Sequence, residues 1–164
     1  MNFEIVPVKT EQQIQAVVDL AIIIWRDHYV PINGQAHVDY MLEKFQSCSA
    51  IRRQLNDGYE YFQIQQGGKL IGYIGVQEDN NSLFLSKLYV SSNMRGHGTS
   101  RKAFEFLQNL CAKRSLKRIW LTCNKYNENT LAVYKHFGFQ IIDSCETDIG
   151  RGYIMDDYIL EYII

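Results

Sequence analysis

Proline is scarce in this sequence, with 2 residues in 164, and no stretch rich in Gly, Pro or Ser separates one part of the chain from another. Repeats and low-complexity segments are absent as well. Hydrophobic residues make up 46% and charged residues 21%, which is typical of a folded globular protein. Because a chain of this length is short for two independent cores, we expect a single domain over residues 1–164.

The sequence also lacks an excess of either charge. Lys and Arg number 17 and Asp and Glu 18, so that the net charge is -1. Such a chain has no overall field that attracts nucleic acid or an anionic membrane. Its most apolar helical stretch, Ile14 to Trp25, is interrupted by Gln15 and Asp19 and is too short to cross a bilayer. We therefore expect neither nucleic acid nor a membrane as a partner.

Metal-type cysteine spacing is missing too. The four cysteines, Cys48, Cys111, Cys123 and Cys145, form no C-x-x-C pair. No basic segment followed by an apolar one comes after Met1, as a secretory signal would require. We expect reduced thiols in a cytoplasmic protein that holds no metal.

What the sequence does contain is an ordered series of strand-like and helix-like segments. Gly67-Gly68 and Asp79-Asn80-Asn81 are turn signals between three alternating runs, which predicts an antiparallel meander. Strands are expected at 3–8, 59–66, 69–78, 83–90 and 118–123, with two more after residue 138, and helices from Thr10 and at 38–45, 99–114 and 127–137. The resulting order, β-α-α-βββ-α-β-α-ββ, indicates an α/β (α+β) fold in which helices cover both faces of a mixed sheet.

One early segment is predicted as a loop. Pro31 and Gly34 punctuate residues 29–34, after the first helix. Trp25 and Tyr29 lie beside this loop, where their rings would line a pocket. Simple packing of both aromatics in the core is the alternative.

The segment from Leu88 to Ser100 runs from an apolar strand through a glycine loop into a helix. Glycines at 96 and 98 let successive backbone N–H groups converge, and the first turn of the helix adds unpaired donors and the positive end of the helix dipole. This context predicts a site for a phosphate or pyrophosphate, whereas a bare G-x-G is more often a plain turn. A P-loop is excluded because no Gly-Lys-Ser/Thr follows, and a dinucleotide fingerprint would need a parallel βαβ unit.

Two motifs together resemble a known family. Arg95-Gly96-His97-Gly98-Thr99-Ser100 is similar to the Arg/Gln-x-x-Gly-x-Gly/Ala signature of the GNAT acetyltransferases, with Ser100 in place of the usual Gly or Ala. The run from Asn127 through Tyr134 to Gly138-Phe139 is similar to the second half of the family pattern, with Thr130 in place of the commoner Ala. Asn127 and Tyr134 are seven residues apart and so lie about 10 Å apart along one helical face. Alone, Asn127 would be read as an N-cap and Tyr134 as a core aromatic.

The resemblance implies a GNAT-type, mostly antiparallel central sheet of about seven strands with helices on both faces. It also implies acetyl-CoA as the cosubstrate, with the loop amides on the CoA pyrophosphate and the preceding strand along the pantetheine arm. The cofactor-binding residues that it implies are Leu88, Tyr89, Val90, Arg95, Gly96, His97, Gly98, Thr99, Ser100, Asn124, Asn127, Tyr134 and Lys135.

The chemistry of acetyl transfer requires a base, an oxyanion donor and an acid for the departing thiolate. Tyr134 is the acid that the resemblance implies, and a backbone N–H near Leu88 is the oxyanion donor. Many relatives carry Glu on the strand before the loop, where this sequence has Ser86 and Lys87, and Ser86 could only relay a proton through water. Asp156 and Asp157, which would point to opposite sheet faces, are further candidates for the base, although both could equally be solvated carboxylates.

The acceptor is expected to be a small primary amine. The segments around Trp25 and Tyr29, around Tyr40, and around Tyr153, Asp156 and Asp157 resemble the bacterial spermidine/spermine acetyltransferase group, which implies a polyamine acceptor. Aromatic rings and carboxylates suit such a cation. Acetylation of a protein N-terminus or lysine, and a catalytically silent acyl-CoA sensor, are the alternatives. A homodimer is possible as the oligomeric state.

Overall fold

The computed structural model describes residues 2–164, which form seven strands and five α-helices. All seven predicted strands and all four predicted helices are present, and a fifth helix lies between the second predicted helix and the meander. The elements are β1 (Phe3–Pro7), α1 (Glu11–Asn33), α2 (Gln35–Gln46), α3 (Cys48–Asn56), β2 (Tyr59–Gln66), β3 (Lys69–Asp79), β4 (Ser82–Val90), α4 (Thr99–Arg114), β5 (Arg118–Asn124), α5 (Glu128–Phe137), β6 (Gln140–Gly150) and β7 (Tyr153–Ile163), with a single 3-10 turn at Ser92–Met94.

The strands form one sheet in the order β1-β2-β3-β4-β5-β7-β6. Neighbouring strands are antiparallel except β4 and β5, which are parallel. The hairpin between β2 and β3 turns at Gly67 and Gly68, whose φ angles of 59° and 79° match the prediction of a turn that needs positive φ at both positions. The predicted mixed and mostly antiparallel sheet is therefore confirmed.

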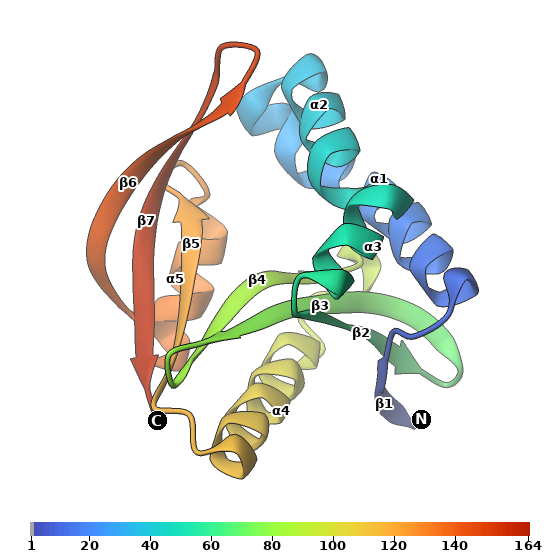
Figure 1. Cartoon of the computed structure of the whole chain (residues 1–164), viewed down its shortest axis with the longest axis vertical. Helices are drawn as coiled ribbons and strands as arrows, with labels where there is room; N and C mark the ends of the chain where they lie inside the picture. Colours follow the sequence, from blue (N-terminus) through green and yellow to red (C-terminus); the bar gives the residue numbers. More distant parts are fainter. Residues whose placement is uncertain (1) are drawn as a thin grey trace.

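The parallel pair β4 and β5 stays together for only a short distance. Register is kept from Ser82 opposite Arg118 to Phe84 opposite Trp120, and no further pairing follows. Figure 1 shows the two strands pointing in different directions beyond that point, with β5, β6 and β7 on one side and β2, β3 and β4 on the other. The sheet is thus split at its centre, where the edge of β4 beyond Phe84 has no strand partner within residues 2–164.

Two separate cores cover the two faces of the sheet. Helices α4 and α5 pack on one face, where Ala103, Leu107, Leu131 and Tyr134 meet the apolar residues of β2 to β5. Helices α1, α2 and α3 pack on the other face, where the buried residues are Ile14, Val17, Val18, Ala21, Ile24, Trp25, Val38, Met41, Leu42, Ile51, Tyr61, Tyr73 and Ile149. Helices α1 to α3 lie next to the place where β4 and β5 separate (Figure 1).

A chain of buried hydrogen bonds fastens this second layer to the sheet. The Trp25 indole N–H donates to the Tyr73 hydroxyl at 2.9 Å, and Tyr73 donates to the Gln46 side chain at 2.6 Å. The Gln46 amide donates to Tyr61 at 3.0 Å, and Tyr61 donates to Gln54 at 2.6 Å. Because buried polar groups are stable only when they are paired, this network sets the positions of α1, α2 and α3 together.

The prediction of a loop over residues 29–34 is wrong. Helix α1 continues through Pro31 to Asn33, and α2 begins directly after Gly34, whose φ is 86°. Proline removes only one hydrogen bond when it stands in the last turn, and burial of Ile24 and Trp25 holds the helix in place. Trp25 and Tyr29 therefore project from a helix, not from a loop.

The helix α3 was missed because its sequence signal is weak. It has nine residues, of which only Ala50 and Ile51 are buried. Ser47 caps it by accepting a hydrogen bond from the Ala50 N–H at 3.2 Å. A short helix of this kind is formed mainly by tertiary packing, which a single sequence does not display.

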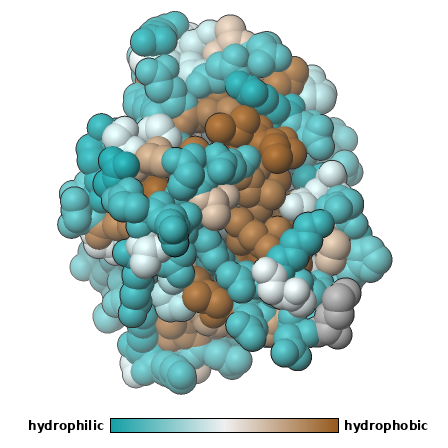
Figure 2. Space-filling view, turned by 90° about the vertical axis from the view of Figure 1, so that its right-hand side faces the viewer, coloured by the Kyte–Doolittle hydropathy of each residue, from teal (hydrophilic) through white to brown (hydrophobic). Residues whose placement is uncertain are grey.

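The outer surface is mixed in character. Seen from the right-hand side of Figure 1, apolar side chains gather in the middle of the face turned to the viewer, within a surround of hydrophilic residues (Figure 2). Ile23, on α1, is 64% exposed. Within residues 2–164, the helices fall short of the length and apolar character that crossing a membrane requires.

Candidate active site

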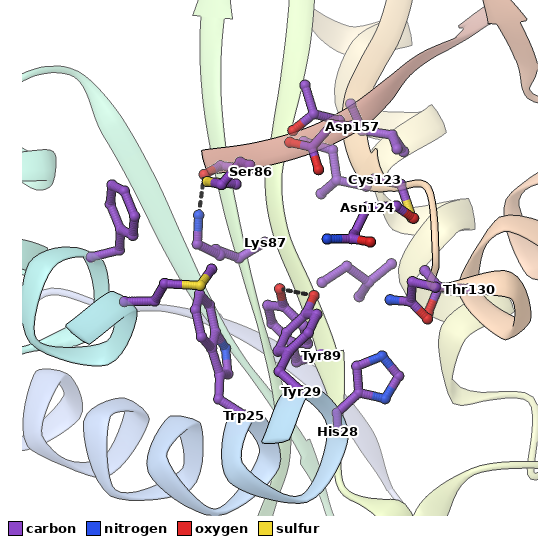
Figure 3. Close-up of a pocket in the computed structure, with 18 of the residues that line it drawn as sticks. Trp25, His28, Tyr29, Ser86, Lys87, Tyr89, Cys123, Asn124, Thr130 and Asp157 are labelled. Carbon is purple, nitrogen blue, oxygen red and sulfur yellow. Dashed lines mark hydrogen bonds between the residues drawn. The ribbon is translucent and has the colours of Figure 1, made fainter. Parts of the chain in front are cut away.

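A cavity of about 810 Å³ occupies the region where β4 and β5 part. Its walls come from three sources: residues 84–89 of β4 and 121–124 of β5 form the middle, α5 forms one side, and α1 to α3 with the β6–β7 hairpin form the other. Figure 3 shows side chains from these elements converging on this space. We name the α5 side the cofactor half and the α1–α3 side the acceptor half.

The glycine loop precedes α4 at the open end of β4. Gly96 and Gly98 both have φ of 78°, a conformation that only glycine adopts without strain. A Cβ atom on either residue would meet nothing within 4 Å, so the loop surface is open. Among residues 2–164, no acceptor pairs with the backbone N–H groups of residues 96–100. These free donors at a helix N-terminus are suited to an anion.

Strand β4 carries a bulge where it pairs with β3. Gly75 lies opposite Lys87 and Val76 opposite Leu85, so Ser86 is one extra residue in β4. The bulge turns Ser86 and Lys87 together toward the cavity, and the Lys87 ammonium donates a hydrogen bond to the Ser86 hydroxyl at 2.8 Å. Ser86 therefore lines the cavity, and its hydroxyl accepts a hydrogen bond from Lys87.

The cofactor half contains the predicted Asn127 and Tyr134. Asn127 is 4% exposed and lines the cavity, and its side chain makes no capping bond to α5. Tyr134 is buried at the edge of the Phe139 ring, with ring centroids 5.3 Å apart. Burial raises the pKa of the Tyr134 phenol well above its ordinary value, with smaller contributions from Cys123 and Tyr29, so the hydroxyl stays protonated.

These features fit coenzyme A. The free amides of residues 96–100 suit its pyrophosphate, and the unpaired edge of β4 suits the amides of its pantetheine arm. Arg95, Asn124 and Asn127 add polar groups to the cavity wall. The fit rests largely on backbone groups, which explains why Ser100 in place of Gly or Ala need not disturb it.

In the acceptor half, Trp25 and Tyr29 lie one helical turn apart, with their rings 5.4 Å from each other. The Tyr29 and Tyr89 hydroxyls are hydrogen-bonded at 2.9 Å, and burial raises the pKa of Tyr29 to about 12. Trp25 is only 2% exposed. Both residues line the cavity as predicted, and both also take part in the packing that was the alternative.

The two adjacent aspartates of β7 differ in their surroundings. Asp156 pairs with Lys125 at 2.8 Å and lies outside the cavity wall. Asp157 is 4% exposed and lines the cavity near Cys123 and Asn124 (Figure 3). Burial raises the pKa of Asp157 to about 6, with a further increase from Asp156 that Lys125 opposes. A carboxyl group with this pKa exchanges protons near neutral pH.

Lys87 lines the cavity although the sequence did not predict it as a site residue. It stands beside Ser86 and makes no ion pair with any acidic residue of 2–164. Burial lowers its pKa to about 8. A single lysine inside the otherwise apolar run Leu83–Val90 was the available signal, because an apolar strand accommodates a charge only at some cost.

Two histidines also enter the cavity wall. Burial lowers the pKa of His28, helped by the charge of Arg95 and opposed by a hydrogen bond with Asn127. Burial likewise lowers the pKa of His37, whose Nε2 atom is buried and has no hydrogen-bond partner among the described residues. Both imidazoles are therefore neutral at pH 7.

Cys123 is a buried thiol on β5 that lines the cavity. Burial and the charge of Asp157 raise its pKa to about 12.

The predicted site residues thus divide into two groups. Those that line the cavity are Trp25, Tyr29, Ser86, Leu88, Tyr89, Arg95, Asn124, Asn127, Tyr134 and Asp157. Those outside its wall are Val90, Gly96, His97, Gly98, Thr99, Ser100, Lys135, Tyr153 and Asp156. Tyr153 stacks on His37 with ring centroids 4.5 Å apart, so it supports a wall residue instead of forming the wall.

Two proteins are similar to this chain in sequence. The uncharacterized N-acetyltransferase YjgM of Escherichia coli (strain K12) is 24% identical over 90 residues, which cover 52% of this chain and 54% of that protein, so the match spans about half of each. The ribosomal protein bS18-alanine N-acetyltransferase of the same strain is 27% identical over 122 residues, 74% of this chain and 76% of that protein.

Solved structures share the fold at low identity. The PaiA N-acetyltransferase from Thermoplasma acidophilum, in complex with coenzyme A, aligns over 100% of both chains with a TM-score of 0.84 and 17% identity. The ribosomal-protein-S18-alanine N-acetyltransferase from Escherichia coli aligns over 99% of this chain and 94% of that chain, with a TM-score of 0.72 and 19% identity.

A family model described as "Acetyltransferase (GNAT) family" matches residues 19–139, which include the glycine loop and both ends of α5. The match covers most of the chain, and the split sheet and free loop amides agree with it. The chain therefore belongs to the acetyltransferase (GNAT) family of N-acetyltransferases.

Proposed function

We propose that this protein transfers the acetyl group of acetyl-CoA to the primary amine of a small molecule, by direct attack of the amine. The observation that carries the proposal is one continuous cavity that joins the free edge of β4 to an acceptor half containing the buried Asp157. Acetyl-CoA supplies the acetyl group as a thioester. The steps below describe what the residues of this chain contribute.

Asp157 is the group we propose as the base. A protonated amine must lose a proton before it can attack, and a carboxylate facing the cavity can accept that proton directly or through one water. With its pKa raised to about 6, Asp157 is ionised at pH 7 yet basic enough to take part in the exchange. Asp156 is unsuited to this role because Lys125 neutralises it outside the cavity.

Tyr134 is the group we propose as the acid. Because burial raises its pKa, its phenol stays protonated at neutral pH and can donate a hydrogen bond to the sulphur as negative charge develops there. The unpaired N–H groups at the free edge of β4, near Leu88, are placed to stabilise an oxyanion. Ser86 has a smaller role in this scheme, because its hydroxyl accepts from Lys87.

The class of amine follows from the walls of the acceptor half. A polyamine acceptor remains a prediction, supported by the aromatic rings of Trp25 and Tyr29 and by Asp157. Lys44, Arg53 and Lys87 in the same walls act against a multiply charged cation. A protein N-terminus is the other candidate, favoured by the similarity to a ribosomal protein bS18-alanine N-acetyltransferase.

The test is thiol release from acetyl-CoA, with mass spectrometry of the acetylated product, across polyamines, amino acids, other small amines and peptides with a free N-terminus. Turnover of a small amine is the expected result. Turnover of peptides alone would replace the proposal with protein acetylation. Tight binding of CoA with no turnover on any amine would favour an acyl-CoA sensor.

A further inference from the structure

Lys87 places an isolated positive charge in the acceptor half. Gly75 of β3 lies opposite Lys87. A Cβ atom added to Gly75 would lie 3.1 Å from the Tyr61 ring and 3.4 Å from the Lys87 Cβ, so both side chains lie on the same face of the sheet. Tyr61 belongs to the core under α1 to α3, and Lys87 therefore lies on the face that these helices cover. An ammonium group has three hydrogens to donate, and one of them is directed to Ser86. The other two have no acceptor among residues 2–164.

An unpaired charge of this kind is costly for the folded protein. Removing an ammonium from bulk water disfavours its charged form, and the structure offers Lys87 no carboxylate in return. Some other cations of the protein do have such partners, as Arg114 has in Glu60 and Glu78. A ligand that brings its own negative charge would remove this cost.

Asp157 is the complementary group of the same cavity. It is buried, it makes no hydrogen bond with any described side chain, and it forms no ion pair with Lys87. Figure 3 shows Lys87 and Asp157 at different sides of the pocket, with Asp157 beside Cys123 and Asn124. The cavity therefore contains a carboxylate, Asp157, and an ammonium group, Lys87, that do not pair with each other.

Other donors stand in the same walls. Lys44 is bound to the Ile149 carbonyl, and Arg53 lines the cavity from α3. The buried Nε2 of His37 is without a partner among the described residues. Asp57, at the end of α3, is the other acidic residue of the cavity wall besides Asp157.

We propose that the acceptor is an amino carboxylate, whose amine lies at Asp157 and whose carboxylate is bound by Lys87. This proposal rests on the acetyl transfer proposed above and narrows its acceptor. Lys87 is then a specificity residue that binds substrate, and it takes no part in moving the proton. A polyamine, which has a second cation where this acceptor has a carboxylate, would be disfavoured by Lys87.

Matched pairs of acceptors isolate the carboxylate. Each of the twenty protein amino acids is compared with its α-amide, and 4-aminobutyrate is compared with 1,4-diaminobutane. For each member we would measure kcat and KM in the acetyl-transfer assay, and the dissociation constant for the CoA-bound protein by calorimetry. We expect at least one carboxylate to bind at least about 10-fold more tightly than its partner, as a charge-assisted hydrogen bond provides.

Three variants complete the test. In Lys87→Met the preference for the carboxylate should vanish through a higher KM for the carboxylate acceptors. In Lys87→Glu the preference should be reversed toward 1,4-diaminobutane. Lys69→Met, an exposed lysine of β3, should leave every constant unchanged. The melting temperature of Lys87→Met should be equal or higher, because a poorly solvated charge is removed.

Two results would overturn the proposal. One is that no amino carboxylate binds more tightly than its matched amide or diamine. This binding result would contradict the proposal even if no acceptor were acetylated. The other is that Lys87→Met lowers turnover equally for carboxylates and amides, which would indicate a role in proton transfer. Binding of the acceptor is measured separately from turnover. If the protein bound an amine but released no thiol from acetyl-CoA, the proposed acetyl transfer would be wrong while the proposed binding of the carboxylate by Lys87 could still be judged.

Discussion

The two halves of the cavity are built in different ways. The cofactor half depends on the backbone: a strand edge that β5 leaves unpaired and, just outside the cavity wall, the free N–H groups of the loop with positive φ at Gly96 and Gly98. The acceptor half depends on side chains from α1, α2, α3 and the β6–β7 hairpin, which are distant in sequence. A backbone site tolerates changes such as Ser100, whereas a side-chain site can change its ligand with one residue. The predictions below are ways to separate the two halves.

The largest effect is expected in the cofactor half, from Gly98→Val. A β-branched residue at φ of 78° is strained and would displace the amides that meet the anion. We expect the affinity for CoA to fall by about 100-fold, measured by calorimetry, for a loss of about 3 kcal/mol. Gly68→Val is the matched control, since its φ of 79° lies in a hairpin away from the cavity. Equal loss of CoA affinity in both variants would contradict the backbone site.

Asp157→Asn should have the next largest effect, and it should lower the rate of the chemical step without changing the binding of CoA. Loss of a general base lowers kcat by about 100-fold or more, whereas affinity for CoA should be preserved. Because the carboxyl must be deprotonated to act, wild-type kcat/KM should fall as the pH drops below about 6, and the variant should lack this limb. Asp156→Asn, which breaks only the ion pair with Lys125, is the control. If both variants behaved alike, Asp157 would not be the base.

Tyr134→Phe should lower kcat by about 10-fold to 100-fold, because it removes the donor to the sulphur while keeping the ring against Phe139. Steady-state kinetics with calorimetry of CoA binding would check this. Parallel losses of kcat and CoA affinity would show instead that Tyr134 mainly supports the shape of the cofactor half.

The smallest effect is expected for Ser86→Ala. This change removes one hydrogen bond from Lys87, worth about 1 kcal/mol, so kcat/KM should change by about 5-fold or less. A loss approaching that of Asp157→Asn in the same assay would give Ser86 the role of proton relay.

The two halves also differ in how far the sequence predicts them. The meander, the glycine loop and the α5 segment follow from local turn and helix signals, and the structure confirms them. The continuation of α1 through Pro31 and the helix α3 were not predictable locally, because packing of Trp25 and Ile51 decides them. Lys87 was visible in the sequence, but the bulge that turns it toward the cavity and the absence of an acidic partner appear only in three dimensions.

A crystal structure of the protein with CoA tests the division of the cavity most directly. We predict that the pyrophosphate accepts hydrogen bonds from the N–H groups of residues 96–100, that the pantetheine arm lies along the free edge of β4, and that the sulphur lies near Tyr134 and faces the acceptor half with Asp157 and Lys87. A pyrophosphate bound away from this loop, or a sulphur outside the cavity, would contradict the account.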